Sequence, residues 1–223
     1  LLNKKYYFPL CELIKERGYG EKLSMWAYSR IDTVKSPEYL KLIRDAGIKW
    51  LALGIESGVR SIRLEASKGK FQDVDIKDVI KRIHDADIEI IANYLFGLPG
   101  DNLASMQTTL DLSLELCTIA WNAYAVMALP GTALYKRAVE NGYNLPNDYS
   151  GYSFYSHDTL PLPTEHLTPA QIIKFRDDAF TTYHTYPPFL EKIRNKYGDI
   201  SMNNIKDLTK IKLKRKLLEE TAV

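Results

Sequence analysis

The sequence predicts an α/β protein with a parallel sheet, because strand-like and helix-like segments alternate four times along it. Short apolar runs typical of strands begin near residues 23, 49, 88 and 119, and a segment with helical spacing follows each run. Such alternation implies right-handed crossovers, with helices outside the parallel strands. The pattern does not distinguish an open doubly wound sheet from an arc of a barrel. No Gly-x-Gly-x-x-Gly follows any strand, which counts against a dinucleotide-binding fold.

The composition is that of an ordinary globular domain, with 223 residues, 45% hydrophobic and 26% charged. The net charge of +2 is too small to indicate binding to nucleic acid or to an anionic membrane. We find no apolar run of about 18 residues, the length that a membrane span requires. The start of the chain has no secretory signal pattern, and Cys11 and Cys117 are far apart. We therefore expect a reducing, cytoplasmic location.

The first two strands are each preceded by a predicted helix. Residues 9–20 have helical spacing, and the apolar run at residues 23–29 predicts the first strand. Ser36 followed by Pro37 is typical of a helix start, with a serine cap and proline in the first turn. The second strand is expected over residues 49–55, where the apolar run indicates burial on both faces.

The third and fourth strands end in turns rich in glycine and proline. Asp75 is expected to start the helix before the third strand, which covers residues 88–96. The turn at residues 97–101 follows, and its Asp101 could cap the next helix. A fourth strand is expected within residues 119–129, and Thr132 could cap the helix after it.

The alternation stops after residue 142. Tyrosines and prolines crowd residues 143–167, and we expect an ordered loop across the domain because so many aromatic side chains need burial. Thr168, with proline after it and Gln171 three residues on, predicts a capping box and a helix to about residue 186. A last amphipathic helix is expected over roughly residues 203–220. We divide the chain into a core, residues 1–142, and a covering segment, residues 143–223.

The ends of parallel strands meet at one edge of a sheet, so the residues found there are candidates for a site. They are the cation Arg30, the carboxylate Glu56, and the turns at residues 97–101 and 129–132. Glu56 could accept two hydrogen bonds from hydroxyl groups, and its charge would strengthen them. The four histidines have no metal-ligand spacing, and we expect no metal site in this chain.

Taken in order, several segments resemble the radical S-adenosylmethionine (SAM) superfamily, in particular the branch whose members often carry an amino-terminal cobalamin-binding domain. The resemblance covers roughly residues 1–142, and each segment matches weakly while their order and spacing match well. The matching segments are WAYSRID at 26–32, LIRDAGIKWLALGIESG at 42–58, SKG at 67–69, HDADIEIIANYLFGLPGD at 84–101 and ALPGTALY at 128–135.

This resemblance implies a partial TIM-type (β/α) barrel of six units, with about four of its strands in this chain and a helical tail after them. SAM would lie across the carboxyl ends of the strands. Glu56 matches the carboxylate that binds the SAM ribose, and Arg30 matches a position near the methionine moiety. Six further residues match positions near adenine: Asn93, Tyr94 and Phe96 on one strand, and Met127, Ala128 and Leu129, which offer their backbone.

The Cys-x-x-x-Cys-x-x-Cys loop that holds the family's 4Fe–4S cluster does not occur in these 223 residues. We therefore expect a carboxyl-terminal fragment whose cluster ligands lie outside this chain, with any cobalamin in a missing amino-terminal domain. Such a fragment would be inactive alone. It would also expose the edge of its first strand, which could mediate dimerisation.

The family reaction is reductive cleavage of SAM, followed by hydrogen abstraction or methyl transfer. We favour a cobalamin-dependent methyltransferase or another radical-mediated tailoring enzyme, with methylthiotransferase and oxidative cyclase chemistry left open. The alternative from another class is a degenerate barrel that serves as a binding or assembly module. The substrate is not encoded in a recognisable motif.

Overall fold

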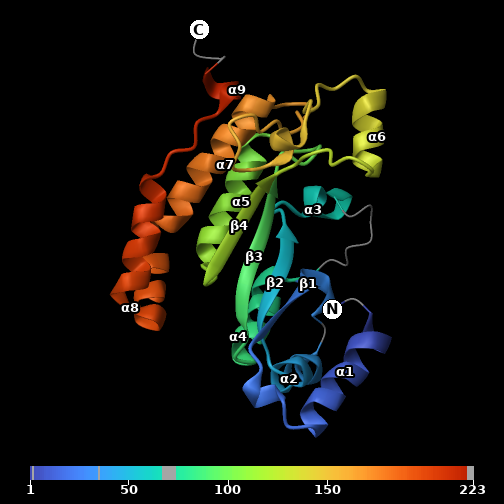
Figure 1. Cartoon of the computed structure of the whole chain (residues 1–223), viewed down its shortest axis with the longest axis vertical. Helices are drawn as coiled ribbons and strands as arrows, with labels where there is room; N and C mark the ends of the chain where they lie inside the picture. Colours follow the sequence, from blue (N-terminus) through green and yellow to red (C-terminus); the bar gives the residue numbers. More distant parts are fainter. Residues whose placement is uncertain (2, 35, 67–73, 220–223) are drawn as a thin grey trace. The chain divides into compact units, whose positions relative to one another are not determined.

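The computed structural model describes residues 1, 3–34, 36–66 and 74–219, so the family-like SKG at 67–69 lies outside the described residues. Four strands form one sheet in the order β1-β2-β3-β4, as Figure 1 shows. Their bounds are Met25–Arg30 for β1, Ile48–Glu56 for β2, Glu89–Phe96 for β3 and Ala120–Ala125 for β4. The predicted α/β fold with four parallel strands is confirmed.

The chain divides into two compact units, which we describe separately. Unit 1 contains Leu1–Glu56, Arg63–Tyr94 and Glu115–Asn122. Unit 2 contains Ser57–Ile62, Leu95–Leu114 and Ala123–Val223. The expected boundary at residue 142 stays a prediction.

Unit 1 holds the pairing of β1 with β2 and of β2 with β3. Trp26 lies opposite Trp50 on the neighbouring strand, and Gly54 lies opposite Asn93 on the next. The buried positions of β2 are filled by aliphatic side chains such as Leu51 and Ile55, and those of β3 include Ile90 and the aromatic Tyr94. Strand β1 forms one edge of the sheet, and dimerisation through that edge stays a prediction.

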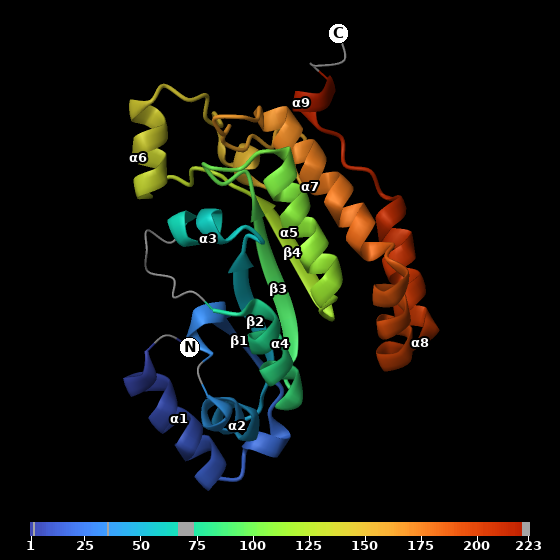
Figure 2. The same ribbon diagram turned by 180° about the vertical axis from the view of Figure 1, so that it is seen from behind.

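The helices of unit 1 begin mostly where their caps predict. They are α1 (Lys4–Glu16), α2 (Pro37–Asp45) and α4 (Ile76–Asp85), and α1 lies beside α2 in both Figure 1 and Figure 2. Ser36 accepts a hydrogen bond from the N–H of Tyr39, and Asp75 caps α4 in the same way. The expected start of the first helix at residue 9 is wrong, because the carbonyl of Asn3 already accepts bonds from Tyr6 and Tyr7.

Unit 2 contains most of the remaining helices. They are α5 (Leu103–Leu116), α6 (Ala133–Glu140), the 3-10 turn η3 (Tyr149–Tyr152), α7 (Pro169–His184), α8 (Pro187–Lys210) and α9 (Lys216–Glu219). The last residues of α5 belong to unit 1. Helix α3 (Arg60–Ala66) begins in unit 2 and ends in unit 1. The predicted capping box of Thr168 and Gln171 is present at α7. Thr132 likewise caps α6.

Two expectations for the covering segment are wrong. Tyr149 and Tyr155 are 85% and 76% exposed, so these aromatic rings are not buried by the loop. The last helix does not run over residues 203–220. Helix α8 ends at Lys210, residues 211–215 form no regular secondary structure, and α9 follows. This segment places the side chain of Arg215 against Asp177 of α7 and the carbonyl of Phe154, contacts that apolar spacing does not encode.

Along the described part of the chain, no helix combines the length and the apolar character that crossing a bilayer requires.

The glycine of the Glu-Ser-Gly sequence after β2 is fixed by close packing within unit 2. A Cβ atom on Gly58 would lie 2.8 Å from the carbonyl oxygen of Thr108 and 3.0 Å from the Cα of Thr109. The N–H of Gly58 donates to Thr109 Oγ1 at 3.0 Å. Ser57 Oγ lies 3.3 Å from the same hydroxyl and is fully buried. Ser57 and Gly58 therefore anchor the chain to α5.

We predict that Gly58→Ala lowers the free energy of unfolding by about 1–3 kcal/mol, the usual cost of forcing extra atoms into a packed site. Urea denaturation followed by circular dichroism measures this change. Ser61→Ala, on the exposed side of α3, is the matched control and should leave the midpoint unchanged. Equal midpoints for the two variants would contradict the packing argument.

Candidate functional site

The backbone of strand β2 turns sharply at Glu56. The pairing with β3 slips here, so that Gly54 lies opposite Asn93 while Glu56 lies opposite Tyr94, with Ile55 as the extra residue. Glu56 itself has φ of 67°, an uncommon value for a residue with a side chain. A bulge of this kind redirects a side chain at the end of a strand, and such strain is typical of functional sites.

The carboxyl group of Glu56 folds back over Gly54. A Cβ atom on Gly54 would overlap Glu56 Oε1, so only glycine leaves room for the carboxyl group in this position. Within the described residues, the carboxyl group of Glu56 has no hydrogen-bond donor or cation as a partner. Burial raises the pKa of Glu56 to about 7, because desolvation disfavours the charged form. The group is therefore suited to a ligand that donates hydrogen bonds.

Arg30 ends strand β1 at the position opposite Gly54. Its guanidinium donates to both carboxylate oxygens of Asp32, with Nε–Oδ1 of 2.9 Å and Nη2–Oδ2 of 2.7 Å. Asp32 is buried in the turn after the strand, while the Arg30 side chain keeps partial exposure. This bidentate pair fixes the direction of the guanidinium. The sequence placed Arg30 at the strand end but did not predict its pairing with Asp32.

Asn93 lies on the open face of β3 with its amide group held on both sides. Its Nδ2 donates to the carbonyl of Ile91 at 3.0 Å, and its Oδ1 accepts from Asn122 at 3.1 Å. Both asparagines line a pocket of about 390 Å³ in unit 1. The other lining residues are Ser24, Met25, Trp26, Tyr28, Trp50, Ala52 and Ile91. Asn122 was not among the residues singled out from the sequence, and only its hydrogen bond to Asn93 identifies it.

Tyr94 and Phe96 point to the opposite face of β3, because side chains alternate along a strand. Tyr94 is 1% exposed and packs against Trp121 with ring centroids 6.2 Å apart. Phe96, in unit 2, is fully buried against Phe175 at 5.1 Å. Their side chains serve the core, so these two positions offer only backbone to a ligand.

In unit 2, the segment after β4 is held by main-chain bonds. The N–H of Val126 donates to the carbonyl of Phe96, and the carbonyl of Val126 accepts from Leu162, both at 2.9 Å. Ala128 is 2% exposed in an apolar cluster with Ala138 and Leu162. Met127 is half-buried and Leu129 exposed. Of the three positions in this segment that the resemblance matches to adenine, Met127 and Leu129 therefore reach the surface.

The turn at residues 97–101 is stabilised by the side chain of Asp101. This buried carboxylate accepts from the N–H groups of Gly97 and Leu98 at 3.0 and 2.9 Å, and from Ser105 Oγ at 2.6 Å. Desolvation raises the pKa of Asp101. The expected role of Asp101 as the helix cap is wrong. Asn102 and Ser105 form the reciprocal capping pair of α5 instead.

The chain's own residues do not fit a 4Fe–4S cluster. Such a cluster is held by cysteine thiolates, and the sequence contains two cysteines, Cys11 in α1 and Cys117 after α5. No group of three or more His, Cys, Asp or Glu side chains among the described residues could hold a metal ion. At the strand end, by contrast, the carboxyl group of Glu56 has no hydrogen-bond partner among the described residues and could accept hydrogen bonds from a ligand.

A partly buried acid at the end of a parallel strand, within a sheet of βα units, is the arrangement found in (β/α) proteins that bind ligands at the strand ends. The profile of the Radical SAM superfamily matches residues 1–113 of this chain. The chain belongs to that superfamily.

Its relatives are longer than the chain itself. The anaerobic magnesium-protoporphyrin IX monomethyl ester cyclase of Cereibacter sphaeroides is 25% identical over 154 residues, which is 69% of this chain and 25% of the cyclase. The heme chaperone HemW of Bacillus subtilis is 25% identical over 112 residues, 50% of this chain and 29% of HemW. The chain thus spans between a quarter and a third of the length of these proteins.

A solved structure has the same fold. The radical S-adenosylmethionine methyltransferase TsrM from Kitasatospora setae, with cobalamin and a [4Fe-4S] cluster bound, superposes with a TM-score of 0.53. The superposition covers 62% of this chain and 29% of TsrM, at 18% sequence identity. The expected partial (β/α) barrel is confirmed at the level of fold.

The raised pKa of Glu56 predicts a pH-dependent stability. The folded state holds a proton on Glu56 that the unfolded state releases near the normal glutamate pKa of 4.5, so stability falls as pH rises from there through about 7. Glu56→Gln removes this dependence and should raise the unfolding free energy at pH 8 by roughly 1–3 kcal/mol. Urea denaturation at pH 5 and pH 8 measures both effects.

Glu21→Gln, at an exposed acid of unit 1, is the control and should show the wild-type pH dependence. A Glu56→Gln variant with the wild-type difference between pH 5 and pH 8 would show that Glu56 titrates normally.

Proposed function

We propose that this chain binds the adenosyl part of SAM in a radical SAM enzyme, and that Glu56 accepts hydrogen bonds from the two ribose hydroxyls. One observation carries the proposal: at the end of a parallel strand, a partly buried carboxyl group has no partner within the part of the chain that the structure describes. Two adjacent hydroxyls supply the two donors that a carboxylate accepts. Hydrogen bonds to a charged group contribute about 1.5–3 kcal/mol each, enough to offset desolvation of the acid.

The same chemistry makes binding depend on protonation. A ribose hydroxyl donates to an ionised carboxylate better than to a neutral acid, so binding lowers the pKa of Glu56. Arg30, whose direction Asp32 fixes, is the proposed contact for the carboxylate of the methionine moiety. Asn93 is held by its own hydrogen bonds and is proposed to contact the ligand without rearranging.

For adenine we propose the backbone of unit 2 after β4. Met127 and Leu129 reach the surface there, while buried Ala128 fixes the segment through its apolar cluster. The backbone of Tyr94 and Phe96 is the proposed contribution of β3. Main-chain N–H and carbonyl groups read the edge of a heterocycle without a charged side chain.

For the reaction we propose methyl transfer with cobalamin, which the bound cobalamin of the structurally similar TsrM supports. A 4Fe–4S cluster would have to be held by cysteines from outside this chain, and it would supply the electron for reductive cleavage of SAM. The residues of this chain orient SAM and exclude water from it. A second candidate is oxidative ring closure, because a cyclase matches 69% of the chain at 25% identity.

The ribose contact predicts a pH-dependent affinity for S-adenosylhomocysteine, which shares the adenosine and amino-acid ends of SAM. With a pKa of about 7, Glu56 is mostly protonated at pH 6 and mostly ionised at pH 8. Isothermal titration of the chain should therefore show affinity about 10-fold higher at pH 8 than at pH 6. Glu56→Gln should bind roughly 10-fold more weakly than wild type at pH 8, with no pH dependence.

Glu21→Gln should bind like the wild-type chain at both pH values. Wild-type affinity in the Glu56→Gln variant would remove Glu56 from the site.

The products distinguish the two candidate reactions. In a protein that joins this chain to a Cys-x-x-x-Cys-x-x-Cys segment, methyl transfer should release S-adenosylhomocysteine together with a methylated substrate. Ring closure should release 5′-deoxyadenosine with no methylated product. Mass spectrometry of anaerobic reactions that contain methyl-labelled SAM separates these outcomes. A cluster-loaded enzyme that forms neither S-adenosylhomocysteine nor 5′-deoxyadenosine would refute both reactions.

A further inference from the structure

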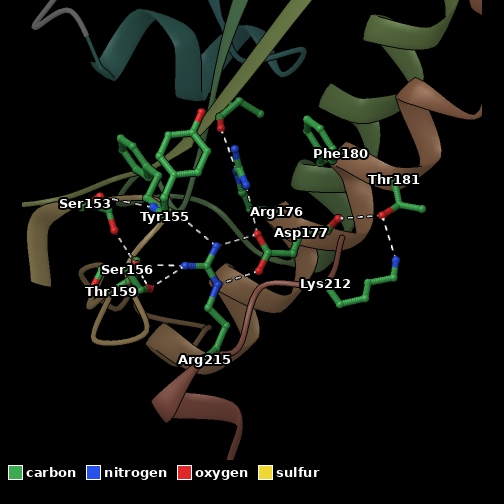
Figure 3. Close-up of polar contacts among 12 residues, drawn as sticks. Ser153, Tyr155, Ser156, Thr159, Arg176, Asp177, Phe180, Thr181, Lys212 and Arg215 are labelled. Carbon is green, nitrogen blue, oxygen red and sulfur yellow. Dashed lines mark hydrogen bonds and ion pairs between the residues drawn. The ribbon is translucent and has the colours of Figure 1, made fainter. Parts of the chain in front are cut away.

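The side chain of Arg215 is almost fully buried although its neighbours are exposed lysines. It is 2% exposed, in the segment 211–215, which we call the latch segment. Its Nε and Nη2 donate to the two carboxylate oxygens of Asp177 at 2.8 and 2.9 Å. Figure 3 shows this fork against α7, within unit 2. The sequence gives no sign that this one cation among many is buried.

The remaining N–H groups of Arg215 bind the loop at residues 143–167, which we call the tyrosine-rich loop. Nη1 donates to the carbonyl of Ser156 at 2.9 Å and to Thr159 Oγ1 at 3.0 Å, and Nη2 donates to the carbonyl of Phe154 at 2.9 Å. A guanidinium has five N–H donors, and these contacts use all of them. Arg215 therefore ties together the latch segment, α7 and the loop (Figure 3).

One route from Arg215 reaches β4 through α7. Asp177 also accepts a hydrogen bond from Arg176 Nη1 at 3.0 Å. The Nε of Arg176 donates to the carbonyl of Ala123 in β4 at 2.9 Å. Arg176 is itself buried, and the low dielectric of the protein interior strengthens the hydrogen bonds of this series of charged groups.

A second route reaches the end of β4 through the loop. Phe154, whose carbonyl Arg215 holds, packs against Tyr124 of β4 with ring centroids 5.2 Å apart. Three residues after Thr159, the N–H of Leu162 donates to the carbonyl of Val126 at 2.9 Å. The two routes thus contact β4 at Ala123 and the chain just after it at Val126. Met127 is the next residue.

We propose that Arg215 is a positioning residue that sets the backbone of Met127–Leu129 for adenine. This inference rests on the proposed binding of SAM by the chain. Loss of Arg215 leaves Asp177 with Arg176 as its remaining cation and takes from the carbonyl of Phe154 the donor that holds it, so the surroundings rearrange. The loop would then release Leu162, and the carbonyl of Val126 would lose the partner that fixes its direction. The latch segment thereby controls the adenine end of the site without contacting the ligand.

The test uses the 223-residue chain and the variant Arg215→Gln. Lys214→Gln is the matched control, because Lys214 is an exposed cation on the same segment. Binding of S-adenosylhomocysteine at pH 8 is measured by isothermal titration. The methyl group of Met127 is followed by NMR of the chain labelled with methyl-¹³C methionine, which has four such groups and is assigned with Met127→Leu. Hydrogen exchange reports on the N–H of Leu162.

Arg215→Gln should weaken binding roughly 5-fold or more, the lower end of coupling between distant sites. It should also shift the Met127 methyl signal and accelerate exchange at Leu162. Arg215→Lys keeps the charge but not the fork, so it should recover only part of the affinity. Lys214→Gln should change none of these quantities.

A folded Arg215→Gln chain with wild-type affinity and an unchanged Met127 signal would overturn the proposal. Should that variant fail to fold, Thr159→Val removes one of the five contacts of Arg215 and should move the same signals in the same direction. A Thr159→Val chain that leaves the Met127 signal and the Leu162 exchange at wild-type values would equally overturn it. Absence of S-adenosylhomocysteine binding by the wild-type chain would refute the proposed function. The Met127 methyl signal and the exchange rate at Leu162 would still decide whether Arg215 positions the backbone of Met127–Leu129.

Discussion

The cost of holding a carboxyl group away from water, with no cation beside it, is the constraint on which the strand-end site depends. Glu56 meets this constraint through three local features: a bulge in the pairing of β2 with β3, a left-handed backbone, and a glycine at position 54 beneath the acid. Each feature is unfavourable or limiting in an ordinary strand. Together they point a partly desolvated acid at the end of a rigid element, where a ligand that donates hydrogen bonds gains most.

The two units use different physical means to prepare a surface. In unit 1, side chains are fixed by direct polar pairs, as Asp32 fixes Arg30 and Asn122 fixes Asn93. In unit 2, the exposed element is backbone, and its support is a set of buried charges centred on Arg215, Asp177 and Arg176. A buried ion pair contributes little net stability but restricts geometry when all of its hydrogen bonds are made. That restriction suits the role proposed for the backbone of Met127–Leu129.

Membership of the Radical SAM superfamily constrains the ligand more than the reaction. A cyclase, a heme chaperone and a methyltransferase share this sequence pattern or this fold, although they act differently. One scaffold supports several functions when the common ligand binds at the strand ends and the variable partners bind elsewhere. The residues with the clearest physical role here are Glu56 and the anchor formed by Ser57 and Gly58, and under the proposed function Glu56 contacts the common ligand.

The sequence by itself determined the order of strands and helices, most helix starts, and Glu56 as the acid at a strand end. Helix caps such as Ser36, Asp75 and Thr168 act on N–H groups two or three residues away, and burial patterns repeat over a few residues, so both are visible locally. Only the tertiary structure decided that Tyr94 and Phe96 face the core, that Asp32 takes the fork of Arg30, and that the last helix stops at Lys210. It also decided the role of Arg215, whose partner Asp177 is 38 residues away. The physical reason is that a long-range contact depends on how elements pack, and no local pattern of charge or apolarity records which lysine or arginine will be buried.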